Sequence, residues 1–184
     1  WKGKVWLDGK DITSLSPYEI NRLGIGYFLQ GGKVFPSLSV RENLGIGALG
    51  LSQEEKEKRV EEVLTIFDNL KGLLDRRVGL ISGGERQALA LAMILIKKPQ
   101  VLLLDEPSAG LSPRYVSDFM RKIDEVNKKW FASIILVEQD IAAALKIAQK
   151  IKVLVKGEFY LESNSAVELL SSEKLAVAFL GCGV

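Results

Sequence analysis

The sequence predicts an α/β fold in which a mostly parallel β-sheet is flanked by helices. Two short runs, residues 101–104 and 133–137, are apolar at every position but one, as strands buried on both faces are. They alternate with amphipathic helical patterns, which is typical of helices that cover a parallel sheet on both sides. The middle third, residues 40–98, reads as consecutive helices. We therefore expect a helical subdomain there, inserted in an α/β core made of residues 1–39 and 99–184.

The segment before the helical subdomain predicts a strand, a helix and a second strand. The first twelve residues alternate apolar and polar positions and break at an Asp-Gly pair, as a strand that leads into a turn does. A short helix is expected over residues 17–23, with Ser16 as its cap and proline at its first position. An apolar strand over residues 25–30 and a loop over residues 31–39 follow.

The later elements follow from the spacing of apolar residues. Apolar side chains recur at helical spacing in residues 53–70 and 113–129, and the first of these segments has pairs of opposite charge on its polar side. Helices are expected over residues 53–70, 82–98, 113–129, 164–171 and 173–180. A Lys-Gly pair between two short apolar runs predicts a hairpin over residues 151–162.

Composition excludes several classes of protein. The 184 residues are 47% hydrophobic, which suits one domain with a sizeable core. A net charge of only +2, with both signs mixed along the chain, does not favour nucleic acid as a partner. The single Cys182 and an N-terminus unlike a signal peptide favour a reducing, cytoplasmic setting. The longest apolar run, at 88–96, is too short to span a bilayer, so any membrane connection runs through a partner.

The chain contains no histidine, so carboxylates, amides and backbone groups must carry any chemistry. Two adjacent carboxylates, Asp105 and Glu106, leave the apolar run at 101–104 at the place where ligands collect in open parallel sheets. An Asp there can hold Mg²⁺, and its neighbour can orient the water that attacks a γ-phosphate. The structural alternative is a strand that has simply reached solvent. The Pro-Ser-Ala-Gly-Leu sequence that follows favours the site.

A second candidate is the Ile-Ser-Gly-Gly-Glu sequence at residues 81–85. Ser82 and Glu85 have the spacing of a capping box, in which the two side chains satisfy N–H groups at a helix start. That structural alternative leaves Gly83 and Gly84 unexplained, because glycine weakens a first helical turn. Two glycines let a phosphate approach the backbone N–H groups, where the helix dipole favours an anion. We therefore expect Ser82 to donate its hydroxyl to a ligand rather than cap the helix.

Several segments resemble the ABC ATPase family. "ISGGERQALALAMIL", "VLLLDEPSAGLSP" and "IILVEQD" have the order and spacing of its signature, its Walker B motif with D-loop, and its switch segment. "GIGYFLQGGKVFPSLSVRENL" resembles its Q-loop region, with Gln30 at the glutamine position. The resemblance covers nearly the whole chain and implies a P-loop NTPase-like fold. "LSPYEINRLGIGY", "FPSLSVRENL", "VEQ" and the ending "AFLG" are most similar to the ATP-binding subunits of branched-chain amino-acid importers.

The resemblance implies a role for each candidate residue. Asp105 serves Mg²⁺, Glu106 is the catalytic base, and Gln139 takes the switch position. Gln30 touches the metal or the attacking water and reports the nucleotide state to transmembrane permease subunits, which dock on the Gln30 region and the helical subdomain. ATP held mainly by a second ABC ATPase subunit, placed head to tail, contacts Ser82, Gly83, Gly84 and Glu85. Residues 108–111 form the D-loop that crosses this interface, with Ser108 and Gly110 as cofactor-binding residues.

Three departures from the family pattern stand out. The signature has Ile and Glu where Leu and Gln are commoner. Gln139 replaces the usual switch histidine, and an amide can hydrogen-bond a γ-phosphate but cannot carry its proton. No Gly-x-x-x-x-Gly-Lys-Ser/Thr motif, the P-loop that cradles phosphates, occurs in the sequence. In the family this loop precedes the strand with which the sequence begins, and Trp1 is not an initiator methionine. We therefore expect residues 1–184 to be an N-terminally incomplete fragment of a single ABC ATPase domain.

Two functions of different classes follow. The parent protein is expected to bind and hydrolyse ATP as a subunit of an ABC importer for branched-chain amino acids, powered by dimer closure. It would be cytoplasmic and peripheral on the inner face of the cell membrane. The alternative is that this chain, without a P-loop, is a non-catalytic binding or interaction module. An ABC ATPase of DNA repair or translation is a third hypothesis, but neither long coiled coils nor paired cassettes are visible in the sequence.

Overall fold

The computed structural model describes residues 2–166 and residue 169 of the chain. It divides into two compact units, Trp1–Gln139 and Asp140–Val184, which are described separately. The first unit contains β1 (Trp6–Leu7), β2 (Lys10–Asp11), α1 (Pro17–Arg22), β3 (Ile25–Phe28), α2 (Val40–Gly47), α3 (Gln53–Ile66), the 3-10 helices η1 (Asp68–Leu73) and η2 (Val78–Leu80), α4 (Gly83–Leu95), β4 (Val101–Asp105), α5 (Pro113–Trp130) and β5 (Ser133–Val137). The second contains α6 (Ile141–Leu145), β6 (Ile151–Val155) and β7 (Glu158–Ser163).

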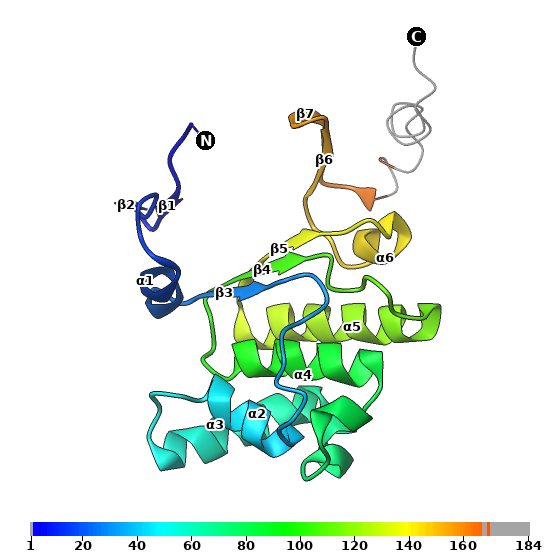
Figure 1. Ribbon diagram of the computed structural model, residues 1–184. Coiled ribbons are helices and arrows are strands. Elements are labelled where there is room, and N and C mark those ends of the chain that lie inside the picture. The colour runs from blue at the N-terminus through cyan, green and yellow to red at the C-terminus, as the bar shows by residue number, and fades with distance from the viewer. Residues whose placement is uncertain (1, 167–168, 170–184) are drawn as a thin grey trace. The chain divides into compact units, whose positions relative to one another are not determined.

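The centre of the first unit is a parallel sheet in the order β3-β4-β5 (Figure 1). Tyr27 lies beside Leu103, and Leu103 lies beside Ile135, so the strands are in register along their length. The predicted parallel sheet flanked by helices is therefore confirmed. Because the strands are parallel, their carboxyl ends meet at one edge, where the candidate residues of three chain segments come together.

Alternate side chains of the sheet point to two different faces. Phe28, Leu102 and Leu104 are at most 1% exposed. In Figure 1, α5 and α4 lie beneath the sheet. The ring of Phe28 packs against that of Phe119, with 6.2 Å between the ring centroids. More than half of each side chain is exposed at three positions of the opposite face, namely Tyr27, Ile135 and Val137. The described residues of this unit thus cover one face of the sheet and not both.

The strand and turn expected at the start of the chain are also present. β1 and β2 form an antiparallel pair in which Trp6 faces Asp11. Asp8 and Gly9 both have positive φ, 49° and 77°, as the tight turn of a two-residue hairpin requires.

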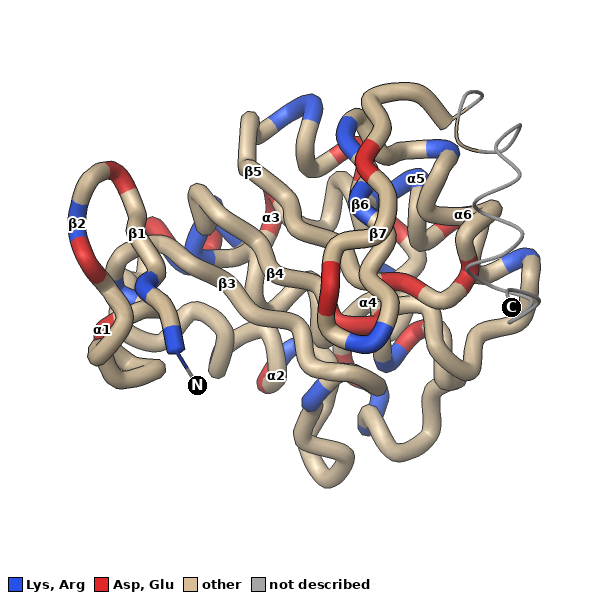
Figure 2. The backbone as a smooth tube through the Cα atoms, turned by 90° about the horizontal axis from the view of Figure 1, so that it is seen from above, with Lys and Arg blue, Asp and Glu red and all other residues tan. Residues whose placement is uncertain are grey.

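Charged side chains of both signs are interspersed along the described chain, without a block of one sign (Figure 2).

The segment between β3 and β4 consists of consecutive helices, as predicted. The helix expected over 53–70 ends at Ile66, because Phe67 leaves the helical conformation with φ −102° and ψ 57° and the chain continues as η1. The helix expected over 82–98 runs over Gly83–Leu95. α2 packs closely on α4: a side chain at Gly47 would lie 2.5 Å from the backbone oxygen of Met93. The division into a helical subdomain and an α/β core stays a prediction.

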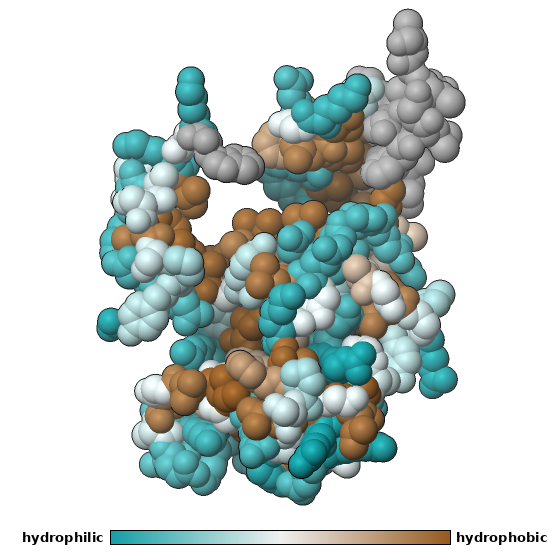
Figure 3. Space-filling view, viewed as in Figure 1, coloured by the Kyte–Doolittle hydropathy of each residue, from teal (hydrophilic) through white to brown (hydrophobic). Residues whose placement is uncertain are grey.

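An open pocket of about 280 Å³ lies where the helical segment meets β3 and the loop after it. Its lining includes Leu29 and Lys33 of that loop, Ile46 of α2, and Met93 of α4, with Lys97 just beyond α4. Hydrophobic atoms gather on this side of the molecule, in the space-filling view of Figure 3.

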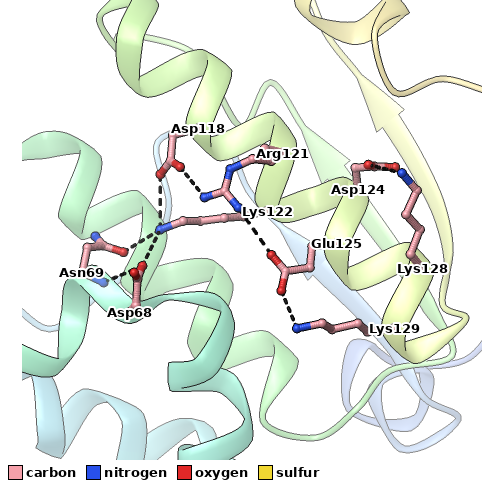
Figure 4. Close-up of polar contacts among 9 residues, drawn as sticks. All are labelled: Asp68, Asn69, Asp118, Arg121, Lys122, Asp124, Glu125, Lys128 and Lys129. Carbon is pink, nitrogen blue, oxygen red and sulfur yellow. Dashed lines mark hydrogen bonds and ion pairs between the residues drawn. The ribbon is translucent and has the colours of Figure 1, made fainter.

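A buried lysine connects α5 to η1 (Figure 4). Only 2% of Lys122 is exposed, and its ammonium lies 5.4 Å from the centre of the Phe67 ring. The ammonium donates to the side-chain oxygen of Asn69 at 2.6 Å and pairs with Asp118 at 3.2 Å and Asp68 at 3.7 Å. Lys122 therefore joins the helical segment to α5 through charge, hydrogen bonding and an aromatic ring.

The second unit is a short helix with a hairpin. β6 and β7 pair antiparallel around Lys156 and Gly157, so the predicted hairpin is confirmed. α6 was not predicted; its first turn is capped by the carboxylate of Asp140. Leu145 of α6, Val153 of β6 and Leu169 form a small core. The helices expected at 164–171 and 173–180 lie wholly or mostly outside the described residues.

Candidate functional site

The acid pair lies at the carboxyl edge of the sheet, as predicted. Asp105 is the last residue of β4, and Glu106 follows with φ +45°, in the left-handed region that costs a non-glycine residue roughly 1–2 kcal/mol. The backbone N–H of Glu106 donates to the oxygen of Val137 at 2.9 Å, so β5 holds the chain in this turn. Strained backbone of this kind is typical of functional sites.

Both oxygens of the Glu106 carboxylate are held by amides. The Gln30 side chain donates its N–H to Oε2 at 2.5 Å, and the Gln139 side chain donates to Oε1. Gln30 follows β3 and Gln139 follows β5, the two neighbours of β4. Three of the predicted site residues therefore form one hydrogen-bonded group, in which the direction of the carboxylate is set by two neutral donors.

Asp105 keeps most of its carboxylate free. Its described contact is with the Tyr27 hydroxyl, at a long 3.4 Å. Mg²⁺ commonly takes only one or two carboxylates and completes its shell with phosphate and water. The described residues hold no cluster of three or more metal-ligating His, Cys, Asp or Glu side chains. Asp105, with the amide oxygen of Gln30, fits such an ion.

Ser82 caps α4, so the expectation that it would not cap is wrong. Its oxygen accepts the Glu85 N–H at 3.3 Å, and its own N–H donates to the Glu85 carboxylate at 2.7 Å. The reason is that the first N–H groups of a helix need acceptors. In the other capping boxes, Ser16, Ser39 and Ser52 also donate their hydroxyls to the glutamate, at 2.7 to 2.9 Å. Ser82 makes no such bond among the described residues, so its hydroxyl proton remains available.

The two glycines at the start of α4 have different explanations. A side chain at Gly84 would lie 2.8 Å from a ring carbon of Tyr115, so α5 leaves no room for one. Packing therefore gives Gly84 a structural reason, and its contact with a ligand stays a prediction. At Gly83 the nearest atom, on Arg86, would lie 3.9 Å away. Gly83 is the position at which open space lies over the helix start.

The predicted D-loop is a tight turn after Glu106. Ser108 is 6% exposed, and its backbone N–H donates to the Glu138 carboxylate at 2.9 Å. The N–H of Ala109 donates to the oxygen of Glu106 at 3.1 Å. Gly110 has φ +77°, which favours glycine, and no atom lies within 4 Å of where its side chain would be. The turn is thus anchored at Ser108 and open at Gly110.

Three residues that contact the site were not predicted from the sequence. Tyr27 contacts Asp105, Glu138 holds Ser108, and the buried Gln87 donates to the backbone oxygen of Ala109 at 3.0 Å. Glu138 carried a usable signal, because it is an acid at the carboxyl end of a strand. Gln87 carried one too, as a polar residue directly before the apolar run of α4.

The structure brings some predicted residues together and leaves others apart. Asp105, Glu106, Gln30 and Gln139 share the carboxyl edge of the sheet, and the turn that bears Ser108 and Gly110 follows directly. Ser82 and Gly83 are exposed at the tip of α4, and no described contact joins that tip to Glu106. The sheet edge and the helix tip are two separate surfaces of one unit.

A parallel sheet that collects an acid pair and two amides at its carboxyl edge, with a glycine-led helix tip at the surface, is typical of P-loop-type nucleotide-hydrolysing proteins. The ABC transporter family matches residues 1–109. The chain belongs to this family.

Several relatives are ATP-binding proteins of transport systems. The branched-chain amino acid transport ATP-binding protein LivF of Archaeoglobus fulgidus is 40% identical over 97% of this chain and 75% of its own length. BraG of Pseudomonas aeruginosa, a high-affinity branched-chain amino acid transport ATP-binding protein, is 34% identical over 97% and 76%. An Fe(3+) ions import ATP-binding protein, FbpC of Pasteurella multocida, is 36% identical over 89% and 49%. The expectation of an ABC-type ATPase as parent protein is confirmed.

Solved structures agree in fold. CbiO1 of Clostridium perfringens, part of the ABC transporter complex cbiONQ, has a TM-score of 0.81 and 30% identity, over 96% of this chain and 70% of that one. MJ0796, a bacterial ABC transporter cassette with a dimeric structure, has a TM-score of 0.76 and 26% identity, over 89% and 73%. In this chain, none of the described helices is both long and apolar enough to cross a bilayer.

Proposed function

We propose that the parent protein is the ATP-hydrolysing subunit of an ABC importer and that Glu106 is its catalytic base. The observation that carries this proposal is the Glu106 carboxylate, held between the amides of Gln30 and Gln139 at the carboxyl edge of a parallel sheet. A carboxylate whose two oxygens are fixed by neutral donors is well placed to orient a water and take its proton.

The neighbouring residues divide the remaining tasks. A Mg²⁺ ion held by Asp105, with the Gln30 oxygen, would neutralise charge on the phosphates. Gln139 donates to Glu106, and in this proposal its amide turns to the γ-phosphate when ATP is bound. Gln30 joins Glu106 to the loop after β3, so a movement of the carboxylate would displace that loop.

The exposed tip of α4 supports a head-to-tail dimer. Gly83 has open space above it, and Ser82 has an uncommitted hydroxyl proton at a helix start that favours anions. No described contact links this tip to Glu106 of its own chain, so the tip serves ATP held by a second subunit. Glu85 and the Gly110 turn belong to the same interface in this proposal.

The pocket beside the Gln30 loop supports docking of transmembrane permease subunits. It is lined by Leu29 and Lys33 of that loop and by Ile46 of the helical segment, so an occupant would contact both. Such contact places the protein in the cytoplasm, peripheral on the inner face of the cell membrane. Branched-chain amino acids are the proposed cargo, because the relatives LivF and BraG carry that role.

The test is Glu106→Gln in the parent protein, meaning the chain extended upstream to include a P-loop. We expect the variant to bind Mg-ATP and to slow turnover by at least about 100-fold, because positioning and charge dominate phosphoryl transfer. Glu57→Gln on the exposed surface of α3 is the matched control and is expected to be silent. Turnover retained by Glu106→Gln would remove Glu106 from the role of base.

A second candidate function is a non-catalytic binding module, favoured by the lack of a P-loop motif in the 184 residues. We expect this chain alone to bind Mg-ATP weakly and not to hydrolyse it, whereas the extended protein does both. Equal hydrolysis by the two would contradict the proposal that a P-loop supplied upstream is needed. Inactivity of both would favour the binding module.

A further inference from the structure

Gln87 is a buried polar residue in an otherwise apolar part of α4. It is 6% exposed, and its side-chain N–H donates to the backbone oxygen of Ala109 at 3.0 Å. Its other side-chain atom, Oε1, is buried and has no hydrogen-bond partner among the described residues. The side-chain amide of Gln87 therefore has a partner for its N–H group but, among the described residues, none for its oxygen.

Packing alone does not account for this amide. An unpaired buried acceptor costs about 1–3 kcal/mol, and a leucine or methionine of similar size would avoid that cost. The orientation of the amide is also determined, because the reverse orientation would bring two oxygens together at Ala109. The bond from Gln87 to Ala109 is thus the feature that explains an amide at this position.

The bond joins the two surfaces of the candidate site. Gln87 lies five residues after Ser82, near the tip of α4. Ala109 lies three residues after Glu106, and its own N–H donates to the Glu106 oxygen at 3.1 Å. Two hydrogen bonds therefore lead from α4 to the backbone of the residue whose carboxylate is held by Gln30.

The loop that bears Gln30 rests on the same part of α4. A side chain at Gly32 would lie 2.8 Å from Cβ of Ala90 and 3.6 Å from Cα of Gln87. A movement of α4 would thus displace both the Gln30 loop and the turn at Ala109. Gln87 adds a directional bond to this contact, at the turn that carries Glu106.

We propose that Gln87 is a positioning residue that couples the two nucleotide sites of the dimer within one chain. This inference rests on the proposed function, in which the Ser82 tip serves ATP of the second subunit and Glu106 serves ATP of its own. The amide of Gln87 holds the Glu106 turn at a set distance from α4. When the Ser82 tip binds ATP of the second subunit, the resulting movement of α4 is transmitted to the Glu106 turn. The rate of hydrolysis then depends cooperatively on the ATP concentration.

The first test is Gln87→Leu in the parent protein, which keeps the size of the side chain and removes the amide. We expect kcat to fall about 10-fold or more and KM to change less than about 3-fold. The reason is that the substitution misplaces Glu106 in the transition state and leaves the binding of ATP in the ground state unchanged. The Hill coefficient for ATP is expected to fall to about 1, since the coupling between sites is removed. Circular dichroism and thermal melting check that the variant folds.

Gln100→Leu is the matched control. Gln100 also donates its side-chain N–H to a backbone oxygen, that of Leu23, at 2.8 Å, but it lies at the opposite end of β4. We expect this variant to keep the kcat and the Hill coefficient of the unsubstituted protein. The same loss in both variants would mean that a generic loss of stability is responsible, and would overturn the coupling role.

A second variant, Gln87→Glu, gives a readout that a purely structural role would not produce. A neutral carboxyl can donate to the Ala109 oxygen, whereas an ionised one repels it. The ratio of its rate to that of the unsubstituted protein is therefore expected to rise as pH falls.

A Gln87→Leu protein with unchanged kcat and Hill coefficient would overturn the inference, as would a rate ratio of Gln87→Glu that does not depend on pH. Absence of ATP hydrolysis by the unsubstituted parent protein would instead overturn the proposed function.

Discussion

The side-chain nitrogen of Gln30 lies 2.5 Å from a carboxylate oxygen of Glu106, although 76 residues separate the two in the chain. β3 and β4 are adjacent and parallel, so the residues that follow them meet at one edge. Gln139 reaches the other oxygen of Glu106 from the far side, after β5. The orientation of this carboxylate thus depends on both neighbouring strands.

Removing one of the two amides is expected to impair catalysis without unfolding the protein. Gln139→Ala in the parent protein frees one carboxylate oxygen, and we expect kcat to fall by about 10- to 100-fold because misplaced catalytic groups cost rates of this order. Gln139→His retains an N–H donor and is expected to recover most of the rate. Steady-state ATP hydrolysis is the measurement.

Gln53→Ala is the control for this prediction, because Gln53 donates to Glu57 at 2.6 Å on the exposed surface of α3. It is expected to leave kcat unchanged. An equal rate for Gln139→Ala and the unsubstituted protein would show that the bond to Glu106 does not matter for hydrolysis.

The start of α4 offers a paired prediction about stability. Gly84→Ala places a methyl group 2.8 Å from the ring of Tyr115, and we expect a loss of about 1–3 kcal/mol in the free energy of unfolding. Gly83→Ala meets open space and is expected to cost less than about 0.5 kcal/mol, as surface substitutions usually do. Urea denaturation measures both. Recovery of Gly84→Ala by the added change Tyr115→Ala would identify the ring as the cause.

Lys122 is expected to stabilise the contact between α5 and η1. Lys122→Ala removes a buried ammonium together with its stem, and we expect a loss of about 1–3 kcal/mol because hydrogen bonds to charged groups are of that order. Lys122→Met keeps most of the packing and is expected to lose less. Thermal or urea unfolding of the 184-residue chain measures both changes.

The exposed pair between Lys128 and Asp124, 2.6 Å apart and also drawn in Figure 4, supplies the control. Lys128→Ala is expected to change the free energy of unfolding by less than about 0.5 kcal/mol, since exposed ion pairs contribute little. A similar effect of Lys122→Ala and Lys128→Ala would contradict the importance of burial at Lys122.

The serine-capped helices make stability depend on acid pH. Two hydrogen bonds from Ser52 lower the pKa of Glu55 from its ordinary value of 4.5. The bond from the hydroxyl has the larger effect, and the bond from the backbone N–H has the smaller one. Because the pKa is lowered by folding, this stabilisation is present above pH 4.5 and is lost as pH falls through the folded value. Ser52→Ala is expected to weaken the pH dependence of unfolding below that pH. An identical pH profile for the variant would rule out this pair as a contributor.

Much of the fold was predictable from local patterns. The apolar runs that became β4 and β5 predicted a parallel sheet, because strands buried on both faces lack alternation. The sheet is parallel, but Ile135 and Val137 are more than half exposed, so the expected burial on both faces is wrong for β5. The spacing of Ser82 and Glu85 allowed a capping box, which the structure contains, although the two glycines between them had led us to expect a ligand role for Ser82 instead. The acid pair at the end of β4 was predicted as a site from its position together with the Pro-Ser-Ala-Gly-Leu sequence that follows it. Each of these signals is contained within a few neighbouring residues.

Other features were not predictable, because they depend on residues distant in the chain. The packing reason for Gly84 is one example, because Tyr115, which occupies the space above it, lies 31 residues later in the chain. Glu138 and Gln87 hold the turn after Glu106 from β5 and α4, and nothing near that turn in the chain points to them.

The sequence by itself determined the parallel sheet, the run of helices between β3 and β4, and the family to which the chain is similar. Periodicity, capping and short motifs involve residues that are close in the sequence, so these patterns can be recognised without the tertiary structure. Only the tertiary structure decided that Glu106 accepts hydrogen bonds from Gln30 and Gln139 and that Gln87 donates one to Ala109. Hydrogen bonds between distant segments require the packing of strands and helices that brings those segments within 3 Å.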